Sequence, residues 1–130
     1  MPGLTDLQEM LKTLEPNQRA GEFVFVAVDA IVARGLPAEA MIIEEEAVTV
    51  VLRRSDADAA GLRYEYVAAW ITLGVKSALE SVGLTAAVSA ALAEAGISCN
   101  MLAGYSHDHI LVPIEQAERA IAALRALSRR

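Results

Sequence analysis

In the first part of the chain, apolar residues recur at spacings that distinguish helices from strands. Four leucines lie three or four residues apart and predict a short amphipathic helix that Pro16 ends: Leu4, Leu7, Leu11 and Leu14. Residues 23–28 are β-branched, aromatic or alanine, which predicts a buried strand. Residues 30–39 contain Gly35 and Pro37 and therefore predict a loop.

Two further strands and a second short helix are predicted in the next segment. Residues 40–43 and 48–53 are largely apolar and flank three consecutive glutamates at 44–46. Since like charges repel on a packed face, and no converging ligands lie nearby, the glutamates predict a solvated hairpin turn rather than a metal site. Ser55 is expected to cap a short helix that reaches Leu62.

From residue 64 the pattern begins again. Residues 64–75 predict a long strand in which Tyr66 and Trp70 are core anchors, and residues 76–82 predict a connector. Apolar residues then recur at helical spacing and predict a helix that packs on a sheet: Leu84, Ala87, Val88, Ala91, Leu92 and Ala95. Gly96 is placed to end this helix, because a residue without Cβ adopts the left-handed conformation at little cost.

The segment after Gly96 predicts two strands joined by a polar tip, followed by the last helix. Residues 97–103 and 110–112 are apolar and extended in character. Between them lie the only two histidines of the sequence, His107 and His109, of which His109 is expected to be half-buried and hydrogen-bonded. The last helix is expected to begin at Pro113 or Ile114 with an apolar inner stripe.

Composition and charge narrow the class of protein. The 130 residues are enough for one ordinary domain or two very small ones. The sequence is 55% hydrophobic, yet its longest run without a charged residue is 13, whereas a membrane-spanning helix needs about 20 apolar residues. We therefore expect no membrane span, and the surplus apolar surface suits a subunit interface. The net charge of −6 argues against nucleic acid as a partner.

Two sequence features bear on the compartment. The single cysteine, Cys99, excludes an intramolecular disulfide. The first 16 residues lack the basic and apolar regions of a signal peptide, so the expected compartment is the cytoplasm.

The stretch from Trp70 to Pro113 resembles the ACT-domain family. A glycine opens a helix at Gly83, the helix ends with Leu-Ala-Glu-Ala-Gly-Ile at residues 92–97, and a strand follows. Within the family, the stretch is similar to a bacterial group of short proteins with two ACT-like halves. It is more distantly similar to the ACT modules of the cytosolic arginine sensor. The leucine-rich helix and the Phe-Val-Phe strand of the N-terminal half resemble the same bacterial group.

The resemblance implies an α+β fold of two ferredoxin-like halves of the βαββαβ type. Each half is expected to be an antiparallel sheet covered by helices on one face, with residues 1–63 in the first half and 64–130 in the second. The similar order of elements in the two halves suggests an internal duplication. ACT domains commonly pair edge to edge, so the resemblance also implies a homodimer.

The function that the resemblance implies is a regulatory sensor that binds a small molecule, with an amino acid as the expected ligand and neither catalysis nor a cofactor. A helix N-terminus presents free N–H groups and a partial positive charge, which favour a carboxylate. Four residues are expected to supply that end of the site: Ser81, Val82, Gly83 and Leu84. Asp108 is expected to receive an ammonium or guanidinium group.

The other expected ligand contacts lie around the polar tip. The resemblance places an aromatic contact at Tyr105 beside Gly104, and Asn100 and His107 lie close by in the sequence. The arginine sensor has an acid three residues after the glycine that opens the helix, where this chain has Ala86, so the resemblance does not carry over selectivity for a basic side chain.

Two other classes of function stay open. One is a small enzyme or metal-binding protein that uses His107, Asp108 and His109, or Cys99 as a nucleophile with a lowered thiol pKa. Zinc needs three or four ligands, and no standard ligand spacing is present. The other is a protein-interaction module with no ligand.

Overall fold

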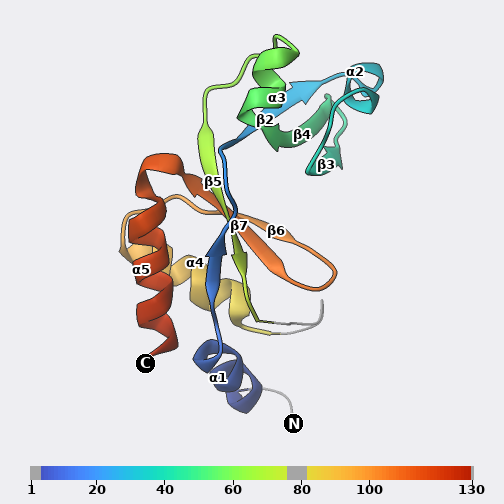
Figure 1. The fold of residues 1–130 in the computed structure, drawn as a ribbon. Coiled ribbons are helices and arrows are strands. Elements are labelled where there is room, and N and C mark those ends of the chain that lie inside the picture. The colour runs from blue at the N-terminus through green and yellow to red at the C-terminus, as the bar shows by residue number, and fades with distance from the viewer. Residues whose placement is uncertain (1–3, 76–81, 130) are drawn as a thin grey trace. The chain divides into compact units, whose positions relative to one another are not determined.

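The computed structural model describes residues 4–75 and 82–129. By their contacts the residues form two compact units, one from residues 1–19 and 70–130 and the other from residues 20–69 (Figure 1). We call them unit 1 and unit 2. The division expected between residues 63 and 64 follows the repeated sequence pattern and stays a prediction.

Unit 2 is a four-stranded antiparallel sheet in the order β3-β4-β2-β5 with two short helices. Its elements follow one another as β2 (Phe23–Val28), α2 (Ala30–Arg34), β3 (Ala40–Ile43), β4 (Val48–Arg53), α3 (Arg54–Ala59) and the first part of β5 (Val67–Leu73). The three strands predicted here before residue 54 are confirmed with the expected bounds. The order is βαββαβ, as the resemblance implies.

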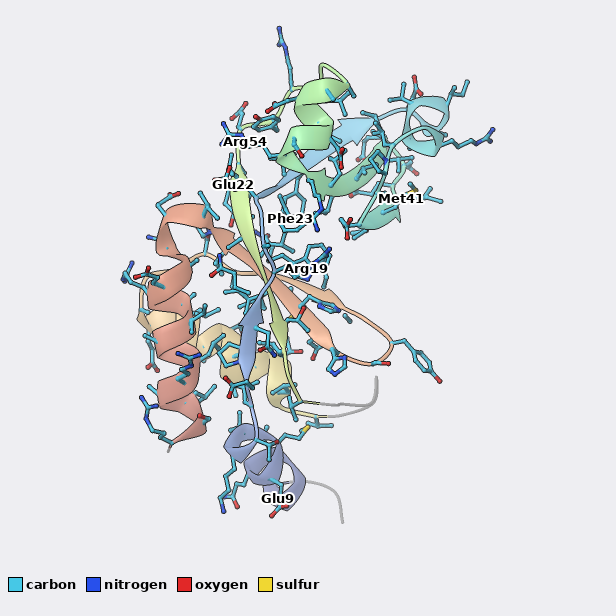
Figure 2. All side chains as sticks on the ribbon, viewed as in Figure 1. Glu9, Arg19, Glu22, Phe23, Met41 and Arg54 are labelled. Carbon is cyan, nitrogen blue, oxygen red and sulfur yellow. The ribbon has the colours of Figure 1, made fainter. Side chains whose placement is uncertain are left out.

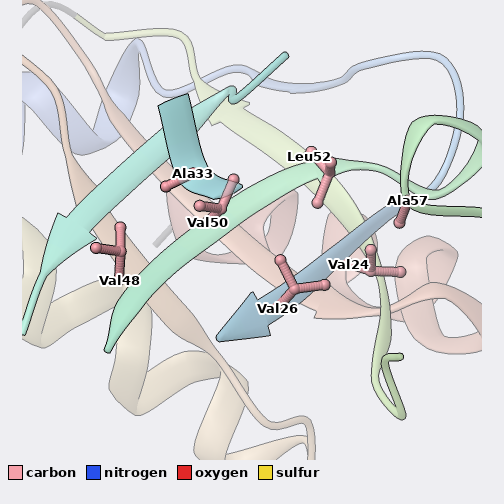
Figure 3. Packing of buried hydrophobic residues seen from close by; sticks show 7 residues of the cluster. All are labelled: Val24, Val26, Ala33, Val48, Val50, Leu52 and Ala57. Carbon is pink, nitrogen blue, oxygen red and sulfur yellow. The ribbon is translucent and has the colours of Figure 1, made fainter. Parts of the chain in front are cut away.

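The two helices of unit 2 cover one face of its sheet. Val24 and Val26 of β2 pair in register with Leu52 and Val50 of β4, so these side chains share a face. The same buried cluster contains one alanine from each helix, as Figure 3 shows: Val24, Val26, Ala33, Val48, Val50, Leu52 and Ala57. The small helical alanines allow both helices to approach the sheet closely.

Two local expectations in unit 2 are wrong. Residues 30–39 are not all loop, because Ala30–Arg34 forms α2 with the Asp29 side chain accepting a hydrogen bond from the N–H of Val32 at 2.9 Å. Ser55 does not cap α3, since the N-cap residue is Arg53 and no side chain caps that helix. Instead, α3 is attached through Arg54, whose Nη1 lies 2.9 Å from Oε1 of Glu22 (Figure 2).

Unit 1 has its own four-stranded order, β1-β5-β7-β6. It contains α1 (Leu4–Lys12), β1 (Pro16–Gln18), the remainder of β5, α4 (Leu84–Glu94), β6 (Asn100–Ala103), β7 (Asp108–Pro113), the 3₁₀ turn η1 (Ile114–Gln116) and α5 (Ala117–Ser128). The predicted helices are confirmed, although the last one begins with the 3₁₀ turn and becomes α-helical only at Ala117. The strand expected over residues 64–75 spans only residues 67–73, and the strand expected over residues 97–103 begins only at Asn100. Residues 76–81 of the expected connector lie outside the described residues.

The apolar stripes predicted for the helices of unit 1 are buried in part, since Ala87 and Ala95 of the predicted α4 stripe and Leu7 and Leu11 of the predicted α1 stripe are partly exposed. In α4 the buried side chains are Leu84, Val88, Ala91 and Leu92, and in α5 they are Ala117, Ala120, Leu124 and Leu127. The two helices contact each other, and α5 also contacts β1 and β7. Gly96 follows α4 with φ +74°, the left-handed conformation expected of it.

The N-terminal segment completes the sheet of unit 1. Pro16 does not simply end the first helix, because residues 16–18 form β1 and pair antiparallel with residues 71–73 of β5. Two backbone hydrogen bonds flank the pairing, from Gly74 N–H to Glu15 O at 2.6 Å and from Arg19 N–H to Trp70 O at 2.8 Å. Unit 1 therefore has the same strand order as unit 2, but its fourth strand comes from the start of the sequence.

Strand β5 serves both units in turn. Its residues Val67 and Ala68 pair with Val24 and Phe23 in unit 2, and residues 71–73 pair with β1 in unit 1. The segment from β1 to β2 likewise begins in unit 1 and continues into unit 2. The fourth strand of the unit 2 sheet, β5, thus continues into unit 1, and the fourth strand of the unit 1 sheet, β1, leads along the chain into β2 of unit 2.

Candidate functional site

The start of α4 presents backbone N–H groups to which its N-cap residue, a glycine, offers no side-chain acceptor. Gly83 is the N-cap residue, with φ 102° and ψ −23°. Leu84 is buried in the core of unit 1, whereas Val82 is 80% exposed. The first N–H groups of this 11-residue helix, for which Gly83 supplies no side-chain cap, and the positive end of the helix dipole suit an anion.

Gly83 itself has two structural reasons to be glycine. Its positive φ is strained for residues that carry a Cβ. A Cβ at this position would also lie 2.8 Å from Cδ2 of Leu7, so α1 packs directly against it. The side of Gly83 that lacks a Cβ therefore faces Leu7. Ser81, the fourth residue expected at this end of the site, lies outside the described residues.

The polar tip is a tight hairpin loop between β6 and β7. Ala103 pairs with Asp108, and the N–H of Gly104 donates to the carbonyl oxygen of His107 at 2.9 Å. Because that oxygen would lie 2.6 Å from a Cβ on residue 104, the loop needs glycine there. Tyr105 at the tip is 88% exposed, and Asn100 is exposed at the start of β6.

His109 anchors the hairpin to the strand β5. The Trp70 indole Nε1–H donates to Nδ1 of His109 at 3.3 Å, and Oγ1 of Thr72 lies 3.0 Å from the same nitrogen. The two rings are tilted, with centroids 5.4 Å apart. Because the indole N–H can only donate, Nδ1 must accept, which assigns the ring proton to Nε2. The expectation of a half-buried, hydrogen-bonded His109 is confirmed.

The surroundings of His109 favour its neutral form. Burial lowers its pKa below the ordinary 6.5, and the electrostatic effects of His107 and Arg19 lower it further, while Asp108 acts in the opposite direction. The guanidinium carbon of Arg19 lies 4.9 Å from the centroid of the Trp70 ring. Trp70 is buried, as predicted, and connects Arg19 to the histidine.

Asp108 begins β7 directly beside this anchor and is half-buried. Across the described part of the chain, its carboxylate has no ion pair and no hydrogen bond. A half-buried carboxylate on a fixed hairpin is suited to receive a cationic group of a ligand.

The structure gathers the tip residues into one hairpin but does not join them to the helix start. Gly104, His107 and Asp108 are linked by the hairpin pairing. No hydrogen bond or ion pair connects residues 82–84 with residues 100–108. Sequence reasoning missed Thr72 and Arg19 as supports of the tip. The alternation that puts Trp70 and Thr72 on one side of β5 is the signal that identifies Thr72.

The described residues give no geometry for the metal or nucleophile alternatives. Within residues 4–75 and 82–129, no three His, Cys, Asp or Glu side chains come together as a metal site. Burial raises the pKa of the Cys99 thiol, whereas a nucleophilic cysteine needs a lowered pKa. Over the same residues, no helix is both long and apolar enough to cross a membrane.

Comparison with known proteins identifies the family. Two family profiles described as ACT domain match the chain, over residues 2–69 and residues 65–126. A solved structure from Vibrio cholerae, described as a protein of unknown function and possible transport protein, is 40% identical. The match covers 96% of this chain and 98% of that one, with a TM-score of 0.86. No curated protein matches significantly.

More distant structures share the fold. An Agrobacterium tumefaciens protein is 15% identical with a TM-score of 0.72, covering 88% of this chain and 89% of that one. The ligand-free regulatory subunit of aspartate kinase from Thermus thermophilus is 12% identical with a TM-score of 0.63, covering 86% and 95%. The matches over both halves of the sequence agree with the two βαββαβ-type units of the structure. The chain belongs to the ACT-domain family and carries two ACT domains in tandem.

Proposed function

We propose that this protein is a non-catalytic regulatory sensor that binds an amino acid. ACT domains are typically regulatory ligand-binding modules, and one structural neighbour is a regulatory subunit of aspartate kinase. The observation that carries the proposal is the pair of opposite poles in unit 1. The start of α4, for which Gly83 supplies no side-chain cap, suits a carboxylate, and the Asp108 carboxylate, without an ion partner in the described chain, suits an ammonium group.

The proposed site uses residues from both poles. Val82, Gly83 and Leu84 contribute backbone N–H groups, together with Ser81, and Asp108 binds the cationic group. Gly104, Tyr105 and His107 lie beside Asp108 at the hairpin tip, Asn100 lies opposite Leu111 at the start of β6, and these four residues contact the rest of the ligand. Because Gly104 and His109 fix the hairpin, Asp108 is held in place before the ligand binds, which lowers the entropy cost of binding.

A thermal-shift screen of the twenty amino acids tests this proposal. A ligand at about 100 times its Kd stabilises the folded state by about 2.7 kcal/mol, which is readily measured. We expect one or a few amino acids to raise Tm, and Asp108→Asn to abolish the shift. Glu115→Gln, which removes an exposed acid from η1 of the same unit, is the matched control and should keep it.

Other results of the same screen select the alternatives. Stabilisation by zinc or manganese that is lost in His107→Ala would instead indicate the metal-binding or enzymatic function. No response to amino acids or metals would contradict the sensor and favour a ligand-free interaction module.

We also propose that the protein is a homodimer that pairs through strand β3. β3 is the edge strand of unit 2, and it and the neighbouring α2 carry five exposed apolar side chains: Ile31, Val32, Met41, Ile42 and Ile43. Ile43 is 82% exposed and Ile31 78% exposed, and Figure 2 labels Met41 on the strand. An exposed apolar edge strand is a template for pairing with another strand.

A second copy fits this edge by symmetry. In an antiparallel pair of β3 strands about a twofold axis, the carboxyl end of one strand meets the amino end of the other. Each β3 then satisfies the unpaired backbone groups along the edge of the other, and the exposed apolar side chains of the two strands are buried together.

Sedimentation analysis of wild type and two variants tests the dimer. We expect wild type to sediment as a dimer, Ile43→Glu as a monomer and Ala59→Glu, an exposed control in α3, as a dimer. A monomeric wild type, or an Ile43→Glu variant that stays dimeric, would contradict pairing through β3.

A further inference from the structure

Unit 2 contains a hollow whose lining residues belong to neither proposed surface. Its volume is about 290 Å³, and it is lined by residues at the start of β2, the end of β4 and the first turns of α3: Gly21, Glu22, Arg53, Arg54, Ser55 and Asp58. This volume is near the lower limit of small-molecule sites. The formal charges of its two arginines and two acids cancel.

Three of the four charged groups in the hollow belong to one hydrogen-bond network, in which the Tyr64 hydroxyl links Arg54 to Asp58. Nη1 of Arg54 donates to Oε1 of Glu22 at 2.9 Å, and Nε of Arg54 donates to the Tyr64 hydroxyl at 2.8 Å. The Tyr64 hydroxyl in turn donates to Oδ1 of Asp58 at 2.7 Å. The hydrogen bond to Glu22 raises the pKa of Arg54, and Tyr64 raises it further. Both acids are therefore already hydrogen-bonded.

The fourth charged group, Arg53, is held in place without an acidic partner. Its Nη1 donates to the carbonyl oxygen of Ala20 at 3.0 Å, and its guanidinium carbon lies 5.1 Å from the centroid of the Phe23 ring. In the described parts of the chain, no carboxylate forms an ion pair with it. The hydrogen bond to a carbonyl oxygen and the contact with an aromatic ring thus orient the Arg53 guanidinium group, and its remaining N–H groups can donate to a ligand.

Gly21 makes this position of Arg53 possible. A Cβ at residue 21 would lie 2.9 Å from Nη1 of Arg53, and Gly21 has φ +94°, which L side chains rarely adopt. The exposed Ser55 also lines the hollow, and its hydroxyl makes no hydrogen bond within the described residues. The lining therefore includes an oriented cation and a hydroxyl without a hydrogen bond in the described chain.

We propose that this hollow binds a small carboxylate, with the Arg53 guanidinium as its main partner and the Ser55 hydroxyl as a second donor. The planar guanidinium group matches a carboxylate through two parallel hydrogen bonds. Because Glu22 and Asp58 line the same hollow, a singly charged carboxylate is repelled less than a doubly charged phosphate. The site lies wholly in unit 2, whereas the proposed amino-acid site lies in unit 1, so either can exist without the other.

Titration of the full-length protein with acetate, followed by the arginine Nε–Hε signals in NMR spectra, tests the proposal. We expect acetate to shift the Arg53 signal in a saturable way, and Arg53→Gln to weaken acetate binding about tenfold or more. The matched control is Arg63→Gln, since Arg63 is an exposed arginine of the same unit outside the hollow, and this variant should bind acetate like wild type. Inorganic phosphate is titrated in parallel and should bind more weakly than acetate.

Ser55→Ala keeps the test decisive if Arg53→Gln does not fold, because Ser55 is exposed and makes no hydrogen bond in the described chain. We expect this variant to fold and to bind acetate more weakly. Unchanged acetate binding in a folded Arg53→Gln or in Ser55→Ala would overturn the proposal. So would a wild-type protein whose Arg53 signal does not move, or one that binds phosphate more tightly than acetate.

Discussion

At the residue scale, the hairpin that carries Asp108 depends on two of its neighbours. Gly104 closes the loop through its N–H, and His109 fixes the hairpin to Trp70 and Thr72 of β5. Neither residue needs to contact a ligand to matter. Both hold the carboxylate of Asp108 in the position from which it is proposed to bind.

Replacing Gly104 by alanine should destabilise the protein. The new Cβ would lie 2.6 Å from the backbone oxygen of His107 and 2.9 Å from Nε2 of His109, so the loop has to move. We expect a loss of about 1–3 kcal/mol in the free energy of unfolding, measured by urea denaturation. Gly35→Ala is the control, because its Cβ would lie 3.7 Å from the nearest atom at a negative φ, and it should be neutral or slightly stabilising. Equal losses of stability in Gly104→Ala and Gly35→Ala would contradict a steric clash at residue 104.

The lowered pKa of His109 should make the free energy of unfolding depend on pH. Since the folded protein lowers the pKa of His109 below the ordinary 6.5, the unfolded chain takes up this proton first as the pH falls. The stability that neutral His109 contributes is therefore fully present above pH 6.5, and it is lost as the pH falls through the lowered pKa of the folded state. We expect urea midpoints to decrease between about pH 7 and pH 5, and His109→Gln to show a smaller decrease. A variant with the wild-type decrease would show that other groups cause it.

At the element scale, short helices are stabilised by their ends. α2 has only five residues, and the Asp29 side chain satisfies one of its first N–H groups. Such a helix gains little from propensity alone, so its cap and the burial of Ala33 are what stabilise it.

Asp29→Ala should cost about 1 kcal/mol of stability through the loss of this cap. Ser55→Ala is a matched comparison, because Ser55 lies in the first turn of α3 but its side chain caps nothing. We expect urea denaturation to show a change near zero for Ser55→Ala. A loss in Ser55→Ala as large as that in Asp29→Ala would contradict the assigned caps.

The elements that sequence patterns predicted well are those whose own residues carry the signal. β2 and β3 are continuous apolar runs, β4 is largely apolar, and α4 has a buried stripe over three turns, so their positions were predictable. α2 was missed because five residues are too few to show a helical period, and Gly35 and Pro37 close by indicate a loop. β1 was missed because only its pairing with residues 71–73, far along the sequence, makes it a strand.

For the candidate sites too, only the features that depend on local sequence could be predicted. A half-buried His109 and a glycine at the start of α4 follow from local pattern. The hollow around Arg53 does not, because Gly21, Arg53 and Ser55 come together only when β2 and β4 pair. Long-range pairing of this kind leaves no periodic mark in a single sequence.

At the scale of the whole molecule, unit 1 depends on residues from both parts of the sequence. Leu14 is buried at 3% exposure just before β1, and β1 is the fourth strand of the unit 1 sheet. Packing in the first 19 residues should therefore stabilise a unit made mostly of residues 70–130.

Leu14→Ala should destabilise unit 1 by about 2–5 kcal/mol, the usual cost of a large cavity in a core. In hydrogen-exchange measurements we expect the amides of β7 and α5 to lose more protection than those of β2 and β4 in unit 2. Lys12→Ala, which removes an exposed side chain from α1, should leave the exchange protection of both groups of amides unchanged. Greater loss of protection in unit 2 would contradict this dependence.

The strand that unit 1 takes from the start of the sequence also sets an order of events during synthesis. Every residue of unit 2 has been made once residue 69 is added, whereas β1 has to wait for residues 71–73 before it can pair. Adding the 55 residues from position 17 to position 71 takes roughly 3 to 11 s. During that time the apolar side of α1 has no partner helix, since α4 and α5 are made later still. The segment from α1 to β1 is therefore made before unit 2 but buried after it, and a chaperone would have a longer opportunity to bind it than to bind the strands of unit 2.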